Sequence, residues 1–153
     1  MSCLDDLREA LESRILLIDG AMGTMVQEHG LKEEDYRGER FRSHGTPLRN
    51  NNEVLSLVRP DIIEGIHRAY LEAGADIIET NTFNANLLSQ HDFGLADEAT
   101  VRELNVESAR LARRAADALS TSSRRRYVAG ALGPTGKTAT LSPKVSDAGY
   151  RDV

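Results

Sequence analysis

Hydrophobic positions along the chain form short apolar runs that alternate with helical stripes. Residues 15–18, "ILLI", are aliphatic without polar interruption, which is typical of a strand covered on both faces in a parallel sheet. The segments "ADIIETNTF" at 75–83 and "YVAGALGPTG" at 127–136 predict a second and a third strand. Each of the three runs ends in polar or glycine-rich residues.

Helical periodicity predicts three helices around these strands. Leucines at every third or fourth position indicate an amphipathic helix over residues 1–13. A second helix is expected from Pro60, which suits a first helical turn, to Gly74, which suits a left-handed cap. A third is expected over 97–120. Residues 24–59 have a mixed pattern and predict a long loop with a short helical piece near its start.

The order strand, helix, strand, helix, strand predicts an α/β fold with three parallel strands and right-handed crossovers. Carboxyl ends of parallel strands lie at one rim, so Asp19 and Gly20 should converge with residues 79–82 and 133–136. Such rims carry ligand-binding loops. Because an Asp-Gly pair also caps helices and sets turns, the residues alone give equal weight to binding and turn-forming roles for Asp19.

Composition and charge predict a soluble domain, or part of one, in the cytoplasm. The 153 residues are 40% hydrophobic and carry a net charge of -5, which gives no general attraction to nucleic acid or anionic membrane. Arg124 to Arg126 predict a solvated strand entrance. Cys3 is the one cysteine, so no internal disulfide forms, and no apolar stretch approaches the ~20 residues of a membrane span. The four histidines lack paired metal spacing.

Residues 131–138, "ALGPTGKT", suggest an alternative function as a nucleotide-phosphate-binding loop. That motif requires glycine where Ala131 stands, and a helix directly after the Lys-Thr pair. The residues that follow contain Pro143 and little helical periodicity. A glycine-rich loop with an exposed Lys137 is therefore favoured over a phosphate site.

Five blocks of sequence, in order, carry a resemblance to a known family. They are "LIDGAMGTMVQ", "DYRGERF", "NNEVLSLVRPDII", "AGADIIETNTFNA" and "YVAGALGPTGKTATLSP". From about Arg14 onward the chain resembles the amino-terminal homocysteine-binding region of cobalamin-dependent methionine synthase. Relatives that take the methyl group from betaine or S-methylmethionine share the barrel, but "RGERF" and "ETNTFNA" favour the cobalamin-dependent enzyme. Ala21 and Gly136 are conservative departures.

The resemblance implies an eight-stranded (β/α) TIM barrel of which this chain is a βαβαβ portion, residues 14–153 following the helix at 1–13. It also implies a zinc ion held by three cysteine thiolates, which binds the homocysteine sulfur as the nucleophilic anion. The methyl group would come from methylcobalamin on a downstream module and be replenished from methyltetrahydrofolate on another. Methionine is the product.

The resemblance also assigns substrate contacts to residues of this chain. Asp19 stands where the family's carboxylate meets the homocysteine amino group, and Gly20, Ala21 and Met22 would offer backbone contacts. Asn81 and Gly133 are weaker substrate-binding candidates from the other two strand ends. Glu79 is equally well interpreted as a ligand contact and as a buried polar link inside the barrel.

The expected barrel is incomplete in these residues. A full barrel takes about 250 residues and eight strands, whereas three strands are predicted here, and Cys3 lies outside the matching region. The family's zinc cysteines have no counterparts, so the chain by itself is expected to lack methyltransferase activity. An unpaired sheet edge would favour pairing with the remainder of the barrel or self-association. A non-catalytic interaction fragment is the third interpretation, beside the enzyme and the phosphate site.

Overall fold

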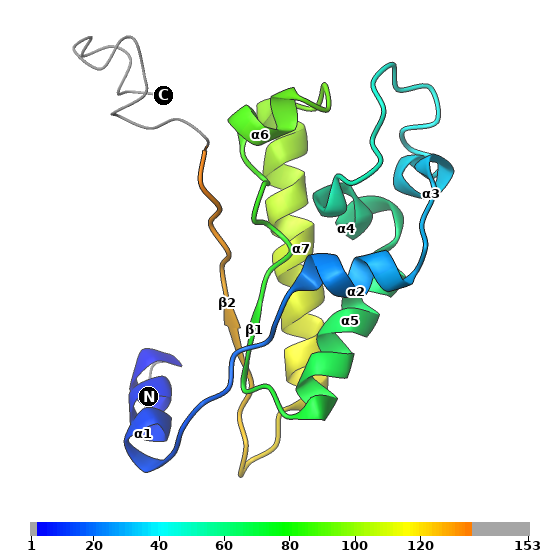
Figure 1. The fold of residues 1–153 in the computed structure, drawn as a ribbon. Helices are drawn as coiled ribbons and strands as arrows, with labels where there is room; N and C mark the ends of the chain where they lie inside the picture. The colour runs from blue at the N-terminus through cyan, green and yellow to red at the C-terminus, as the bar shows by residue number, and fades with distance from the viewer. Residues whose placement is uncertain (1–2, 136–153) are drawn as a thin grey trace, which may run out of the picture.

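The computed structural model describes residues 3–135 (Figure 1). The predicted helices at 60–74 and 97–120 are confirmed, and α1 covers the described part of the helix predicted at 1–13. The second and third strands are present but shorter than the predicted runs. In chain order the elements are α1 (Cys3–Ser13), α2 (Met22–Glu28), α3 (Glu33–Arg37), η1 (Asn52–Val54), α4 (Leu55–Val58), α5 (Pro60–Ala73), β1 (Ile77–Glu79), α6 (Leu87–His91), α7 (Glu98–Leu119) and β2 (Tyr127–Ala129).

The strands β1 and β2 form a small parallel sheet, so the fold is α/β as predicted. Its register pairs Ile77 with Tyr127 and Glu79 with Ala129. The long helix α7 makes the crossover between the two strands, and both strands therefore end at the same edge (Figure 1). This edge is where the site described below is found.

Residues 15–18 run beside β1 but are not the buried strand that their apolar pattern predicts. They make one isolated parallel bridge, from Ile18 to Ile77, with a backbone hydrogen bond from the Ile77 N–H to the Leu17 carbonyl at 3.0 Å. The side chains of Ile15 and Leu17 are 84% and 56% exposed. No other part of the described chain covers them, and an apolar pattern cannot by itself supply that cover.

Helices α5 and α7 pack against each other and against the sheet. The predicted start and end of α5 are confirmed: Pro60 is its first residue, and Gly74 caps it with a φ of 115° and an N–H bond to the Leu71 carbonyl. Asp97 caps α7 by accepting from the Thr100 N–H at 2.8 Å. The apolar faces of both helices contribute a large part of the core, namely Ile62, Ile63, Ile66, Leu71, Leu104, Leu111, Ala112, Ala115 and Ala116.

The segment 24–59 contains more structure than the predicted loop. It holds most of α2 and all of α3, η1 and α4, and it contributes fully buried side chains to the core, among them Leu48 and Leu55. Glu33 organises part of it by accepting from the Leu48 N–H at 2.9 Å. The helical piece predicted near the start of the segment corresponds to α2. Helices α3, η1 and α4 are too short for a periodic apolar stripe, so tertiary contacts specify them and the sequence pattern does not.

A buried carboxylate ties the amino ends of the strands together. Asp76 is 1% exposed and accepts hydrogen bonds from Arg14 and Arg124, each at 2.9 Å, while Arg126 approaches within 3.8 Å. Burial opposes ionisation of Asp76, but hydrogen bonds from the two arginines outweigh it and hold its pKa well below the usual range. The prediction that Arg124 to Arg126 are solvated is therefore wrong for Arg126, whose side chain is 11% exposed.

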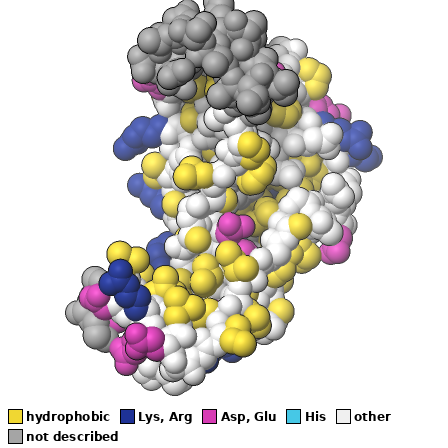
Figure 2. All heavy atoms as spheres, turned by 60° about the vertical axis from the view of Figure 1, so that its left-hand side comes forward, with side chains coloured by type: hydrophobic (Ala, Val, Ile, Leu, Met, Phe, Trp, Pro, Cys, Tyr) yellow, Lys and Arg dark blue, Asp and Glu magenta, His cyan; other side chains and the backbone are white. Residues whose placement is uncertain are grey.

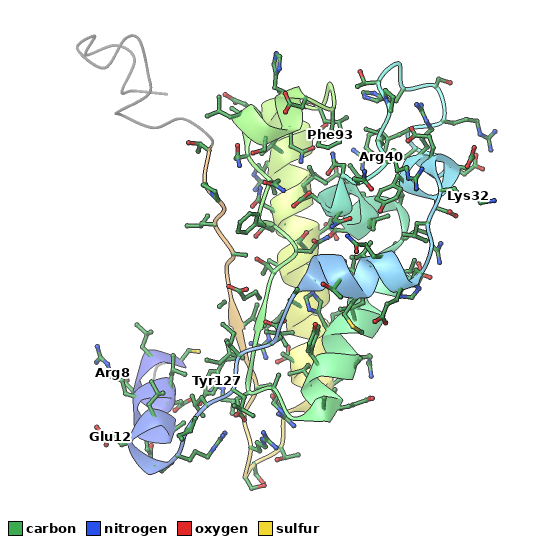
Figure 3. All side chains as sticks on the ribbon, in the orientation of Figure 1. Arg8, Glu12, Lys32, Arg40, Phe93 and Tyr127 are labelled. Carbon is green, nitrogen blue, oxygen red and sulfur yellow. The ribbon has the colours of Figure 1, made fainter. Side chains whose placement is uncertain are left out.

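Helix α1 is attached to the body through few contacts. Tyr127 points from β2 toward α1 (Figure 3), and its hydroxyl donates to the Asp6 carbonyl at 3.2 Å. None of the α1 residues is buried, and Leu4 and Leu11 stay exposed. Figure 2 shows hydrophobic side chains gathered on the face that carries α1. No helix within residues 3–135 is long and apolar enough to cross a membrane.

Candidate functional site

A cleft of about 350 Å³ opens where segment 15–18 and strand β1 end. Three predicted strand ends were expected to meet here. Residues at the first two ends do line the cleft, whereas from the third strand Ala131 contributes and the described part of the predicted end, residues 133–135, does not. The cleft is lined by Asp19, Gly20, Ala21, Met22, Gly23, Asn52, Glu53, Glu79, Thr80, Asn81, Phe83, Asn84 and Ala131. The predicted rim is thus present, and η1 adds a fourth wall that the sequence did not indicate.

Asp19 is held in place by the backbone of β1. Its N–H donates to the Ile77 carbonyl at 2.9 Å, and its carboxylate oxygens accept from the Glu79 N–H at 3.1 and 3.2 Å. Burial raises the pKa of Asp19 to about 6; the Glu79 N–H opposes this shift and the Glu79 charge adds to it. Asp19 therefore carries its charge at neutral pH in a partly desolvated position.

The turn after Asp19 passes over Tyr70 of α5. A Cβ on Gly20 would lie 3.3 Å from the Tyr70 hydroxyl oxygen, and this hydroxyl donates to the Ala21 carbonyl at 3.4 Å. Ala21 has extended backbone and Met22 begins α2. All three predicted backbone-contact residues, Gly20, Ala21 and Met22, consequently line the cleft.

Glu79 ends β1 with an exposed side chain at the cleft. Within residues 3–135 nothing buries this side chain, and both interpretations, a ligand contact and a buried polar link inside the barrel, remain predictions. With Asp19, Glu79 gives the cleft two neighbouring carboxylates. A charge on one side chain disfavours the charge on the other, which is one of the causes of the raised pKa of Asp19.

Glu53 is a cleft residue that sequence reasoning missed. It lies in η1, is 4% exposed, and accepts from the Asn84 N–H at 2.9 Å. Burial raises its pKa. The available signal was a single carboxylate within the apolar run "NNEVLSLV". Such a residue is usually solvent-exposed, so only the packing of η1 against the loop after β1 identifies it.

Asn81 and Gly133, the weaker candidates, have different positions. Asn81 is 5% exposed, lines the cleft, and donates from Nδ2 to the Asn52 carbonyl at 2.8 Å. Gly133 lies next to Phe83: its N–H donates to the Phe83 carbonyl at 3.0 Å, and a Cβ there would lie 2.2 Å from that oxygen. Gly133 does not line the cleft but holds the backbone of Phe83, which does. Ala131 lines the cleft in place of Gly133.

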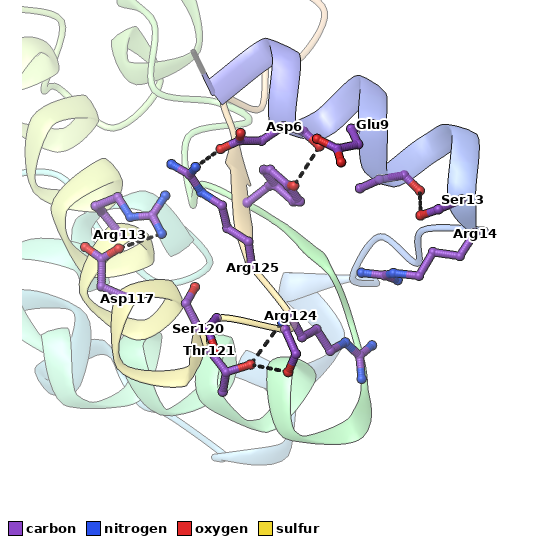
Figure 4. Close-up of a pocket in the computed structure, with 14 residues that line it drawn as sticks. Asp6, Glu9, Ser13, Arg14, Arg113, Asp117, Ser120, Thr121, Arg124 and Arg125 are labelled. Carbon is purple, nitrogen blue, oxygen red and sulfur yellow. Dashed lines mark hydrogen bonds and ion pairs between the residues drawn. The ribbon is translucent and has the colours of Figure 1, made fainter. Parts of the chain in front are cut away.

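A larger hollow of about 640 Å³ lies under α1, near the amino ends of the strands (Figure 4). Its cationic side chains already have anionic partners: Arg125 pairs with Asp6, and Arg113 with Asp117 at 2.8 Å. Ser120 and Thr121 likewise bond within the protein. These internal pairs leave little unsatisfied charge for a ligand, so this hollow is a weaker candidate than the cleft at the strand ends.

No group of three His, Cys, Asp or Glu side chains among residues 3–135 is arranged to hold a metal ion. Cys3 is a free, exposed thiol. Of the alternative phosphate loop at 131–138, residues 131–135 have no helical structure and residues 136–138 lie outside the described part of the chain. The acidic lining of the adjacent cleft does not favour a phosphate there.

Comparisons with known proteins relate the chain to one family. The sequence model of the family described as homocysteine S-methyltransferase matches residues 16–153. Two crystal structures of the homocysteine methyltransferase MmuM from Escherichia coli are similar to the chain. The oxidized form is 30% identical, with a TM-score of 0.67 over 85% of this chain and 41% of that one. The metallated form is 26% identical, with a TM-score of 0.65 over 93% and 44%. The chain thus spans less than half of either relative.

Proposed function

Since this chain belongs to the homocysteine S-methyltransferase family, we propose that the cleft beside Asp19 binds the amino-acid end of homocysteine. The observation that carries the proposal is the desolvated carboxylate of Asp19, fixed by the Glu79 N–H at the strand-end rim. A substrate ammonium group at this position would donate a hydrogen bond to a preorganised, partly buried anion. Hydrogen bonds between two charged groups are stronger than those between neutral groups.

The electrostatics of the whole cleft support a cationic group. Its lining contains the carboxylates of Asp19, Glu53 and Glu79, and no Lys, Arg or His is among the described lining residues. A cleft lined by one sign of charge attracts the opposite sign. The sulfur at the other end of an amino acid bound in this way would point away from the carboxylates, where negative charge on sulfur is less disfavoured.

For the reaction, we propose methyl transfer to the homocysteine sulfur by the whole protein. A carbon–sulfur bond forms, the donor loses its bond to the methyl carbon, and the thiol proton is released. The blocks "RGERF" and "ETNTFNA" favour the cobalamin-dependent branch, in which methylcobalamin would be the donor, methyltetrahydrofolate its source, and zinc the metal on the sulfur. The described residues do not fit a three-cysteine zinc site, so their proposed part is substrate binding.

A calorimetric titration with homocysteine tests the binding proposal. Asp19→Asn should weaken binding about 10- to 100-fold, since a hydrogen bond to a charged group contributes roughly 1.5 to 3 kcal/mol. Asp92→Asn is the matched control, because Asp92 is an exposed residue after α6, outside the cleft. Equal affinities for wild type and Asp19→Asn would remove Asp19 from the site. A parallel titration with ATP tests the phosphate-loop alternative, for which no binding is expected.

A further inference from the structure

Behind the cleft lies a buried polar network that joins four elements. It contains Asn81 after β1, Asn52 in η1, Ser56 in α4 and Ser108 in α7. Asn81, Ser56 and Ser108 are 5%, 3% and 0% exposed. Polar groups buried to this degree are destabilising unless they are hydrogen-bonded. The geometry of the network therefore decides which atom of Asn81 remains available to a ligand.

The nitrogen of the Asn81 amide is fully engaged away from the cleft. Nδ2 donates to the Asn52 carbonyl at 2.8 Å and to Ser56 Oγ at 3.1 Å. A backbone carbonyl can only accept, so the nitrogen, and not the oxygen, must face it. The orientation of the amide follows from this pairing, and the Asn81 side-chain oxygen is directed the other way.

The Asn81 side-chain oxygen is free to accept from a ligand. Nothing within residues 3–135 donates to Asn81 Oδ1, and this oxygen is not one of the buried side-chain atoms that lack a partner, so it is accessible. Asn81 itself lines the cleft. Ser108 supports the arrangement from α7, because its hydroxyl lies 2.7 Å from Ser56 Oγ and 3.1 Å from the Asn81 carbonyl. Ser108 therefore holds both the serine and the backbone of the asparagine.

We propose that Asn81 binds the substrate as a hydrogen-bond acceptor, and that Ser56 is a positioning residue that, together with the Asn52 carbonyl, keeps the Asn81 side-chain oxygen turned to the cleft. Ser108 supports Ser56. This inference rests on the proposed binding of homocysteine in the cleft. It adds the Asn81 side-chain oxygen to the carboxylates of Asp19 and Glu79 as an acceptor in the same cleft. A ligand group with several N–H donors, such as an ammonium, can donate to more than one of these acceptors, whereas a hydroxyl or thiol has a single donor.

The test is a double-mutant cycle on homocysteine affinity, made in the full-length protein with urea unfolding measured for each variant. Ser56→Ala removes one of the two acceptors that hold Asn81 Nδ2 and leaves only the Asn52 carbonyl. It should weaken binding roughly 2- to 10-fold, the usual range for one neutral hydrogen bond. Asn81→Ala should weaken it at least as much. In the Asn81→Ala background Ser56→Ala should have no further effect on affinity, because the group that it positions is gone.

Ser120→Ala is the matched control. Ser120 Oγ also donates one hydrogen bond, to the Ala116 carbonyl at 2.8 Å, and accepts one, from the Arg126 N–H at 3.0 Å, but it lies far from the cleft, at the end of α7. It should alter stability and leave homocysteine affinity unchanged.

Three outcomes separate the possibilities. Loss of affinity in Ser56→Ala that disappears in the Asn81→Ala background supports the inference. If the wild type binds homocysteine and the effects of Ser56→Ala and Asn81→Ala simply add, or Ser56→Ala has no effect, the positioning role is overturned while the proposed function stands. If the wild type does not bind homocysteine, the proposed function fails, and this inference fails with it.

Discussion

Homocysteine binding should depend on the protonation of Asp19. The pKa of this carboxyl is raised to about 6 because it is partly buried, so about one tenth of the molecules carry the charge at pH 5 and about nine tenths at pH 7. If only the ionised form binds the substrate ammonium, the apparent Kd is the intrinsic Kd divided by this fraction, and affinity should fall about tenfold between pH 7 and pH 5.

In protein from which zinc has been removed by a chelator, the substrate contributes little to this change, because no metal ion then displaces the thiol proton. A free amino group stays cationic and a thiol stays protonated throughout pH 5 to 7, since their ordinary pKa values lie at about 8 or higher. Calorimetric titrations at half-unit intervals of pH would therefore report on the protein. The slope should approach one proton per site below pH 6 and level off above pH 7.

Two variants identify the carboxyl that is responsible. Asp19→Asn should bind weakly and with almost no dependence on pH over this range. Glu53→Gln should keep the dependence, although burial also raises the pKa of Glu53. A tenfold change that persists in Asp19→Asn would refute the reasoning.

Loss of fold is not the expected cause of weaker binding by Asp19→Asn. The folded-state pKa of Asp19 lies above its ordinary value, so ionisation of Asp19 opposes folding as pH rises from about 4 to 6. Replacing the carboxylate by a neutral amide removes that penalty. An amide oxygen can still accept the Glu79 N–H. Asp19→Asn should thus be at least as resistant to urea as the wild type at pH 7.

Three further predictions concern stability, each measured by urea unfolding. Gly133→Ala should lower the free energy of unfolding by about 1 to 3 kcal/mol, because its Cβ would lie 2.2 Å from the Phe83 carbonyl oxygen; Gly130→Ala, with open space around the added Cβ, should cost little, and equal losses would contradict the contact. His67 is fully buried without hydrogen bonds, and burial lowers its pKa to about 4. As pH falls, His67 is therefore protonated in the unfolded chain before it is protonated in the folded protein, and the free energy of unfolding should fall by about 3 kcal/mol between pH 6.5 and pH 4. His67→Leu should lose this part of the pH dependence, and an unchanged profile would show that another group is responsible. Asp76→Asn should lower the free energy of unfolding at pH 7 by about 3 to 5 kcal/mol, since it leaves partly buried arginines without their anion. The difference from the wild type should shrink as pH falls below about 4, where the Asp76 carboxyl of the unfolded wild type is protonated.

The location of the candidate site was easier to predict from the sequence than the set of residues that line it. Three predicted strand ends pointed to one rim, and Asp19, Gly20, Ala21, Met22 and Asn81 do line the cleft there. Glu53 was not predicted because η1 reaches the cleft through contacts between segments that are far apart in the chain. Gly133 was predicted at the rim, but its close approach to Phe83 gives it a packing role that no local pattern indicates.

The sequence by itself determined those features that depend on residues close together in the chain. The bounds of α5 follow from Pro60 and Gly74, and those of α7 from its apolar stripe and the Asp97 cap, because capping and periodicity act within a few residues of each other. The tertiary structure alone decided which atom of Asn81 faces the cleft and how Asp76 gathers its arginines. It also decided that residues 15–18 stay uncovered. Burial, desolvation and the direction of a side-chain amide depend on groups brought together from distant parts of the chain, and such groups leave no periodic signal in the sequence.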